Sequence, residues 1–164
     1  ATSFLNNQCH LKTTFNSGKG LDANLQPVTT LADFTPSVTT SSGLSGNYLT
    51  IAQTDEVTVA TTITVDPAHV GQPAELLTVA TFVPLVNPQP LTFMRDADTW
   101  IIWDGDVKAV TVMAVKSQLE NSETLTVYQG NLQGLAGNFL IRVGYRLPDG
   151  TIIYSGEPIE FTVN

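Results

Sequence analysis

Few residues of this chain could act as a nucleophile, a base or a metal ligand. The sequence has one cysteine, Cys9, and two histidines, His10 and His69. A zinc site with three histidine ligands is therefore impossible. Cys9 and His10 are neighbours, so on a strand their side chains point to opposite faces and cannot form a nucleophile–base pair. No Gly-x-Ser-x-Gly motif is present. We therefore expect no catalytic residue, no enzyme activity and no cofactor.

Four aspartates flank the short run from Thr99 to Trp103: Asp96, Asp98, Asp104 and Asp106. Carboxylate oxygens are the ligands that Ca²⁺ prefers. Their spacing differs from that of an EF-hand loop, and aspartate and glycine are common in hairpin turns. We interpret the four as turn residues and expect no metal site, with Ca²⁺ binding as the open alternative.

Three aromatic residues could bind a ligand. Trp100 and Trp103 are three residues apart, so on one strand they face opposite sides. We expect one of them in the core and the other exposed, where it could stack on a sugar or anchor a protein. Tyr128 is a further candidate for such a surface, which Tyr48, Tyr145 and Tyr154 could extend. Packing in the core is the alternative for all three, because β-sandwiches bury aromatic residues.

The composition limits the class of partner and the fold. A net charge of −8 has the wrong sign for binding phosphates or an anionic bilayer, so we expect no nucleic acid partner. No apolar run is long enough for a membrane span, so we expect no membrane insertion. Only 13% of residues are charged, and 23 are threonines, whose β-branching favours strands. The composition therefore indicates a β-rich protein with a neutral polar surface.

Short alternating runs separated by Pro, Gly, Asp or Asn predict an all-β, antiparallel β-sandwich domain over residues 46–164. Residues 107–115 could be buried in a helix or a strand, and their β-branched side chains favour the strand. The last predicted strand has a potential break at 156–158. We expect strands near 48–52, 57–65, 75–83, 91–95, 99–103, 107–115, 123–128, 138–146 and 151–163.

Residues 1–45 have a different texture, rich in Ser, Thr and Asn, with turn signals at 16–20, Pro27, Pro36 and 41–43. We interpret them as an N-terminal arm. Its one good strand candidate is the alternating set Cys9, Leu11, Thr13 and Phe15. This set is our candidate for an assembly contact.

Two segments carry a resemblance to known modules. The hairpin sequence Asn138–Tyr154, turning at Pro148-Asp149-Gly150 and preceded by Gly134 and Gly137, resembles the penultimate strand of immunoglobulin-like modules. The segment Val65–Leu76 resembles the sequence that precedes their second strand. The resemblance implies an immunoglobulin-like sandwich over roughly residues 57–164.

A narrower resemblance is to an uncharacterised module of large secreted or surface proteins of bacteria. It rests on Trp103-Asp104-Gly105, Tyr128-Gln129-Gly130, the run 144–150 and Gly156-Glu157-Pro158-Ile159. It implies an exported structural or adhesive part and brings no catalytic residue. The start at Ala1, without Met, also favours a secreted, cell-surface protein from which a signal peptide has been removed.

Together these features predict an extracellular structural subunit whose partners are copies of itself. An arm of 45 residues can reach a neighbour, since an extended chain spans about 3.3–3.6 Å per residue. There it would add a strand to an open sheet edge, which is similar in architecture to donor-strand assembly of pilins. The product is a filament or surface layer. The alternative is a monomeric carbohydrate- or protein-binding adhesion module, its arm folded back as the first strands of its own domain.

Overall fold

The structure, a computed structural model, describes residues 16–46 and 48–164. Within these residues it contains no α-helix and one short 3₁₀ helix, η1 (Val107–Ala109). The expected all-β class is therefore confirmed. The strands are β1 (Asn16–Leu21), β2 (Pro27–Val28), β3 (Asp33–Thr40), β4 (Leu49–Ile51), β5 (Val57–Thr64), β6 (Ala74–Pro84), β7 (Leu91–Asp96), β8 (Thr99–Ile102), β9 (Ala114–Lys116), β10 (Ser122–Gly130), β11 (Gly137–Arg146), β12 (Ile152–Ser155) and β13 (Ile159–Val163).

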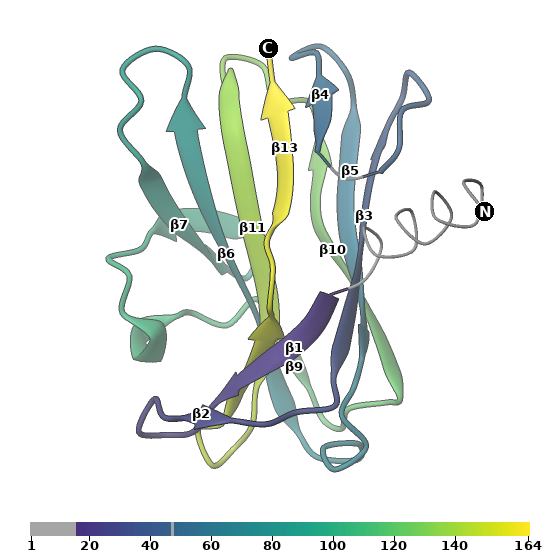
Figure 1. The fold of residues 1–164 in the computed structure, drawn as a ribbon, viewed down its shortest axis with the longest axis vertical. Coiled ribbons are helices and arrows are strands. Elements are labelled where there is room, and N and C mark those ends of the chain that lie inside the picture. The colour runs from purple at the N-terminus through teal and green to yellow at the C-terminus, as the bar shows by residue number, and fades with distance from the viewer. Residues whose placement is uncertain (1–15, 47) are drawn as a thin grey trace, which may run out of the picture.

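One curled sheet contains all of these strands (Figure 1). Its order is β10-β5-β3-β1-β12-β11-β6-β7-β8, and every pair along this path is antiparallel. β13 pairs antiparallel with the first half of β11, and on its other side it pairs in parallel with β4. The turning point is β1, whose first two residues pair with β3 while Gly18–Leu21 pair with β12. The sheet therefore curls at β1 into a half-barrel, with β10, β5 and β3 in one half and β12, β11, β6, β7 and β8 in the other.

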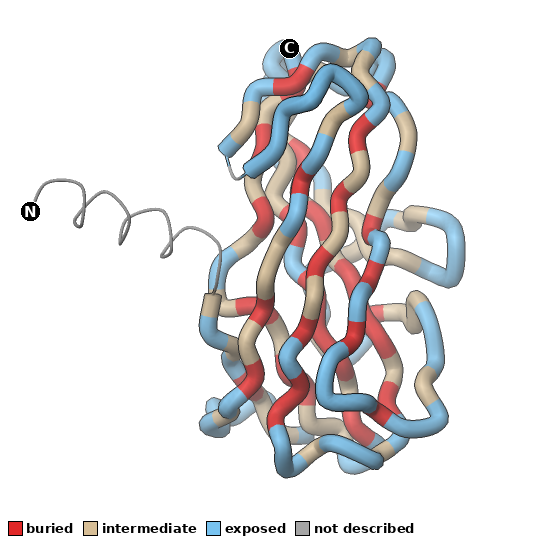
Figure 2. Tube along the Cα trace, turned by 90° about the vertical axis from the view of Figure 1, so that its right-hand side faces the viewer, coloured by how far each residue is buried: buried red, intermediate tan, exposed pale blue. Residues whose placement is uncertain are grey.

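The main core lies between the two halves of the sheet. Buried residues alternate with less buried ones along β5, where Val57, Val59, Thr61 and Ile63 point inward. They share one cluster with residues of β11 such as Tyr145, which is fully buried. Figure 2 shows this alternation along the trace, with the exposed residues concentrated at the loops. Thr58, Thr62 and Thr64 of β5 and Thr124 and Thr126 of β10 occupy outward positions, which gives this part of the sheet a neutral polar outer surface.

Most of the predicted strands are confirmed within two residues at each end, including the break between β12 and β13. The strand predicted at 107–115 is wrong, because only β9 forms at its end. Asp106 caps η1 by accepting a hydrogen bond from the Lys108 amide at 3.0 Å. Val110 is buried by packing against the outward face of the sheet, although it does not pair with any strand. Its apolar, β-branched side chain therefore reflects packing onto a sheet, and not membership of one.

The predicted arm boundary at residue 45 is wrong for residues 16–45. β3 pairs with β5 over its whole length, and Phe34 and Val38 belong to the main core. Residues 16–40 thus fold back as strands of the same sheet, which was the alternative. Nothing described bears on Cys9, Leu11, Thr13 and Phe15, which lie outside the described residues.

The turn signal at 41–43 is confirmed, whereas those at 16–20 and Pro36 lie within strands, for two physical reasons. A Cβ on Gly18 would lie 2.9 Å from the Ala32 carbonyl oxygen, so β1 needs glycine for close approach. The backbone groups of Val38 and Thr40 form hydrogen bonds with Gly46 and Leu44, on the side away from β5. Backbone groups two residues apart on a strand point to the same side, so the position of Pro36 also faces away from β5. The N–H that proline lacks would therefore form no hydrogen bond to β5.

Candidate functional site

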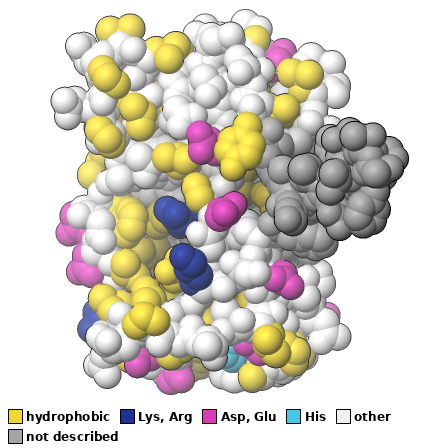
Figure 3. Space-filling view, viewed as in Figure 1, with side chains coloured by type: hydrophobic (Ala, Val, Ile, Leu, Met, Phe, Trp, Pro, Cys, Tyr) yellow, Lys and Arg dark blue, Asp and Glu magenta, His cyan; other side chains and the backbone are white. Residues whose placement is uncertain are grey.

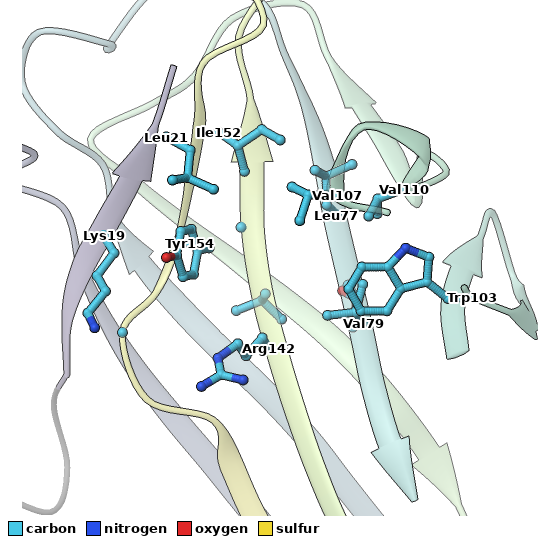
Figure 4. A pocket seen from close by; sticks show the side chains of 14 residues that line it. Lys19, Leu21, Leu77, Val79, Trp103, Val107, Val110, Arg142, Ile152 and Tyr154 are labelled. Atoms are coloured by element: carbon cyan, nitrogen blue, oxygen red, sulfur yellow. The ribbon is translucent and has the colours of Figure 1, made fainter. Parts of the chain in front are cut away.

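The outward face of β6, β11 and β12 is apolar where an outer sheet face is usually polar. Leu77, Val110 and Ile152 form a second buried cluster there, and partly buried Val79, Met94, Trp103, Val107 and Tyr154 pack against it. Beside this cluster is a hollow of about 330 Å³, which we call the outer groove. It runs from Trp103 to Lys19 across β6, β11, β12 and β1 (Figure 4).

Trp103 forms one wall of the outer groove, and its position is fixed by hydrogen bonds. Its backbone N–H donates to the Thr92 carbonyl at 3.0 Å, and the Thr92 hydroxyl donates back to the Trp103 carbonyl at 2.5 Å. The indole N–H donates to the Asp106 carbonyl at 2.8 Å. The polar atom of the ring is thus already satisfied, and the indole presents apolar surface to the groove (Figure 4).

The opposite part of the outer groove is cationic. In Figure 4, Tyr154 and Arg142 lie between Trp103 and Lys19. Within the described part of the chain, the ion pairs are Lys116–Glu123 at 3.2 Å and Arg146–Glu75 at 2.7 Å, so Lys19 and Arg142 take part in neither. Figure 3 shows basic side chains beside the hydrophobic patch of this face. This local positive charge is notable on a chain of net charge −8.

A second hollow, the apolar pocket, lies between the two halves of the sheet. It has a volume of about 290 Å³ and is lined almost wholly by apolar and aromatic side chains, among them Trp100 and Tyr128. Phe139 lies between two rings, with centroids 4.7 Å from Phe82 and 5.2 Å from Phe161. These contacts favour hydrophobic packing and offer no polar group to orient a polar ligand.

Arg95 connects the two halves of the sheet beside the apolar pocket. Its guanidinium carbon is 5.2 Å from the centroid of the Trp100 ring, and its Nη1 donates to the Val127 carbonyl at 2.8 Å. Across the pocket, the Tyr128 hydroxyl donates to the Asn131 carbonyl. Burial, together with the negative charge of Glu56, raises the pKa of Tyr128, so this hydroxyl stays protonated at neutral pH.

A third polar group, around Asp66, is structural in its contacts. Its carboxylate accepts hydrogen bonds from the Thr30 hydroxyl and the Leu31 N–H, both at 2.8 Å, and from the Ala68 N–H at 3.0 Å. Burial by itself raises the pKa of Asp66, but these hydrogen bonds to the charged form outweigh it and lower the pKa.

Nearby, His69 Nδ1 and the Tyr145 hydroxyl are 2.8 Å apart. Burial raises the pKa of Tyr145 to about 12, so the phenol is neutral at ordinary pH. A neutral, fully buried phenol bonded to an imidazole fixes the loop of His69 onto β11. The geometry around Asp66 and Tyr145 therefore holds elements together, and neither residue lines the outer groove or the apolar pocket.

The structure separates the three aromatic candidates. Trp100 packs against the main core cluster and Trp103 against the outer one, so they lie on opposite faces as their spacing predicts. Each is partly buried, so the expected division into one core and one exposed tryptophan does not hold. Tyr128 lies with Trp100 in the apolar pocket, away from Trp103.

Sequence reasoning missed Lys19 and Arg142 as members of a site with Trp103. Lys19 lies in a segment interpreted as a turn. The pairing of β1 with β12 and of β12 with β11 brings it beside Arg142, and no local sequence pattern indicates that pairing. The position of Arg142 could have been predicted in part, because its place between the inward residues Ile141 and Val143 indicates an outward side chain.

The four aspartates are all exposed. Asp104 accepts a hydrogen bond from the Asp106 amide at 2.9 Å, and Asp106 caps η1, which is the expected turn chemistry. In the part of the chain that the structure describes, no group of three or more His, Cys, Asp or Glu is placed to hold a metal ion. That part also contains no helix long and apolar enough to cross a membrane.

Comparison with protein-family models and with curated proteins gives no match for this chain.

Proposed function

We propose that the chain is a non-enzymatic extracellular adhesion module that binds a carbohydrate in the outer groove. The observation that carries this proposal is the apolar and aromatic cluster on the outward face of the sheet, hollowed beside Trp103. Exposed apolar patches with polar rims mark binding sites. Aromatic faces suit the C–H faces of sugar rings, and Lys19 and Arg142 supply donors for hydroxyl groups.

The backbone of the groove floor favours a saccharide over a peptide. β6, β11, β12 and β1 pair with one another in successive ladders beneath the groove. A peptide that binds by strand addition needs a free sheet edge, and the groove lies on the face of inner strands. Side-chain contacts are therefore what this site offers a ligand.

Replacing Trp103 tests this proposal. We expect Trp103→Ala to lose binding in a screen of immobilised oligosaccharides that the unchanged protein binds. Ile102→Ala is the matched control, because Ile102 is 69% exposed and does not line the groove. Thermal unfolding of both variants checks that they remain folded. Binding that survives Trp103→Ala, or a protein that binds no saccharide in the screen, would refute the proposal.

The immunoglobulin-like sandwich is also part of the proposal. It is supported by the core between the two halves of the curled sheet and by the β11–β12 hairpin, in which the Leu147 amide bonds to the Thr151 carbonyl at 2.8 Å. The secreted, cell-surface setting in bacteria rests on the sequence resemblance. An experimental structure that superposes on immunoglobulin-like modules would support this fold, and one with a different strand order would contradict it.

A second candidate function is assembly with copies of the same chain. Its support is that β8 and β10 end the strand order, so each has one side without a neighbour among the described strands. Such edges accept a strand from another molecule. In this proposal the segment with Cys9, Leu11, Thr13 and Phe15 supplies that strand and produces a filament or surface layer.

Deletion of residues 1–15 tests the assembly proposal, because it leaves every described strand complete. We expect the full chain to form polymers in electron microscopy and light scattering, and the shortened chain to remain monomeric and folded. Polymers of the shortened chain, or a monomeric full chain, would refute strand exchange through this segment.

A further inference from the structure

The cationic part of the outer groove is assembled by strand register. Lys19 of β1 pairs with Tyr154 of β12, and Tyr154 pairs in turn with Gly144 of β11. Arg142 lies two residues before Gly144 and so points to the same face. With strands about 4.8 Å apart, β1 and β11 are separated by about 10 Å. Lys19 and Arg142 therefore flank Tyr154 on one surface.

Two glycines open the space between these cations. Gly144 and Gly156 both line the groove and contribute only backbone to its floor. Packing requires both, because a Cβ on Gly144 would lie 2.3 Å from the Ile153 carbonyl oxygen and one on Gly156 would lie 2.5 Å from that of Ser17. The hollow beside Tyr154 thus follows from the close approach of β1, β12 and β11.

The far side of Arg142 leads to the aromatic wall. Arg142 pairs with Val79 of β6, which lies in the cluster with Trp103. From β6 to β1 the groove crosses three strand spacings, about 14 Å in all. A ligand that fills it has an apolar ring at Trp103 and negative charge toward Arg142 and Lys19, so an oligosaccharide fits better than a single sugar.

The charges favour an anion at this position. Lys19 and Arg142 are exposed and join neither ion pair of the described residues. Glu157, which follows Gly156, is an exposed carboxylate near the groove. An arginine binds a carboxylate through two parallel hydrogen bonds, and lysine adds a point charge.

We propose that the outer groove selects acidic saccharides, namely oligosaccharides of hexuronic acids. The sugar rings pack along Trp103 and Tyr154, and their carboxylates bind Arg142 and Lys19. This inference rests on the proposed function of the groove as a carbohydrate site. The main-chain pairing of the groove floor is what favours a sugar over an acidic peptide.

Calorimetric titration with trigalacturonate, in the presence of a chelator, tests the inference. The matched ligand is the methyl ester of the same trisaccharide, which keeps the rings and removes the charges. We expect the acid to bind at least about tenfold more tightly than the ester, with an affinity that falls as salt rises. Arg142→Gln and Lys19→Gln should each abolish most of this preference, and Glu157→Gln should increase it.

Lys108→Gln is the control, because it removes the same charge from an exposed side chain that does not line the groove. It should leave the affinity within about twofold. Equal affinity for acid and ester, or an affinity that Arg142→Gln and Lys19→Gln leave unchanged, would overturn the inference while the carbohydrate site could stand through its dependence on Trp103. Tighter binding of a triglutamate peptide than of trigalacturonate would overturn it in favour of a peptide site. Absence of binding by acid and ester, together with a negative saccharide screen, would overturn the proposed function as well.

Discussion

Replacing Asp66 by asparagine tests how residues 30 and 31 are held to the rest of the sheet. The Asp66 side chain is buried, and its two oxygens accept three hydrogen bonds. Oδ2 accepts from Thr30 and Leu31, and Oδ1 accepts from Ala68. An asparagine can place its carbonyl oxygen on only one of these two sides, so its NH₂ group faces at least one backbone N–H.

The magnitude follows from the number of bonds lost. A buried donor left without a partner costs about 1–3 kcal/mol, so Asp66→Asn should lower the free energy of unfolding by about 2–3 kcal/mol at pH 7. Asp22→Asn is the matched control, because Asp22 accepts two backbone N–H groups at 2.8 and 2.9 Å in an exposed turn. Its effect should stay below about 1 kcal/mol. Urea denaturation of both variants gives these values.

The same carboxylate predicts a pH dependence. Because the folded state lowers the pKa of Asp66, its stabilising contribution is complete above the unfolded pKa of about 3.9 and disappears as the pH falls through the lower pKa of the folded state. Asp66→Asn should remove this part of the acid sensitivity. Hydrogen exchange should also become faster at the Leu31 amide. A variant as stable as the parent, with an unchanged Leu31 amide, would refute the assignment of this tether.

Three further predictions concern the core, a buried phenol and the segment outside the described residues. Ile141→Ala should lower the free energy of unfolding by about 3–4 kcal/mol and Phe139→Ala by about 2–3 kcal/mol, because both side chains line the apolar pocket but Ile141 is buried and Phe139 only partly so. Denaturant unfolding yielding less than about 1 kcal/mol for both would contradict the inward assignment of β11. Tyr145→Phe should cost about 1–2 kcal/mol by leaving His69 without its partner. The raised pKa of Tyr145 predicts stability that is complete below about 10, the unfolded pKa, and is lost as the pH rises toward about 12; an absorbance titration in which every tyrosine ionises near 10 would disprove this. If strand exchange occurs, the Cys9 thiol should react more slowly with a maleimide in polymers than in dissociated chains, and equal rates would exclude its face from the contact.

The strands could be predicted because burial on one side imposes a period of two. β5 shows this most clearly, since its buried residues alternate with partly exposed ones over the whole strand. Residues 107–115 could not be predicted in the same way. Their apolar side chains are buried on the outside of the sheet, so they carry a strand-like composition without forming a ladder.

The segment from Asn16 to Thr40 was misjudged because glycine and proline have two uses. Glycine and proline are common in turns, yet here Gly18 permits close approach of two strands, and Pro36 occupies a position whose N–H would form no hydrogen bond to β5. The candidate sites show a similar limit. The spacing of Trp100 and Trp103 placed them on opposite faces, but the partners of Trp103 come from distant strands whose register no local pattern reveals.

The central claim is that the outer groove, and not the apolar pocket, binds the saccharide. The two tryptophans provide one indole N–H signal for each site, so a two-dimensional ¹⁵N–¹H spectrum during titration with trigalacturonate reports on both at once. We expect the Trp103 indole signal to shift with increasing ligand, together with the amides of Gly144 and Tyr154, while the Trp100 indole signal stays in place. A shift of the Trp100 signal with a stationary Trp103 signal, or no shift of either, would contradict it.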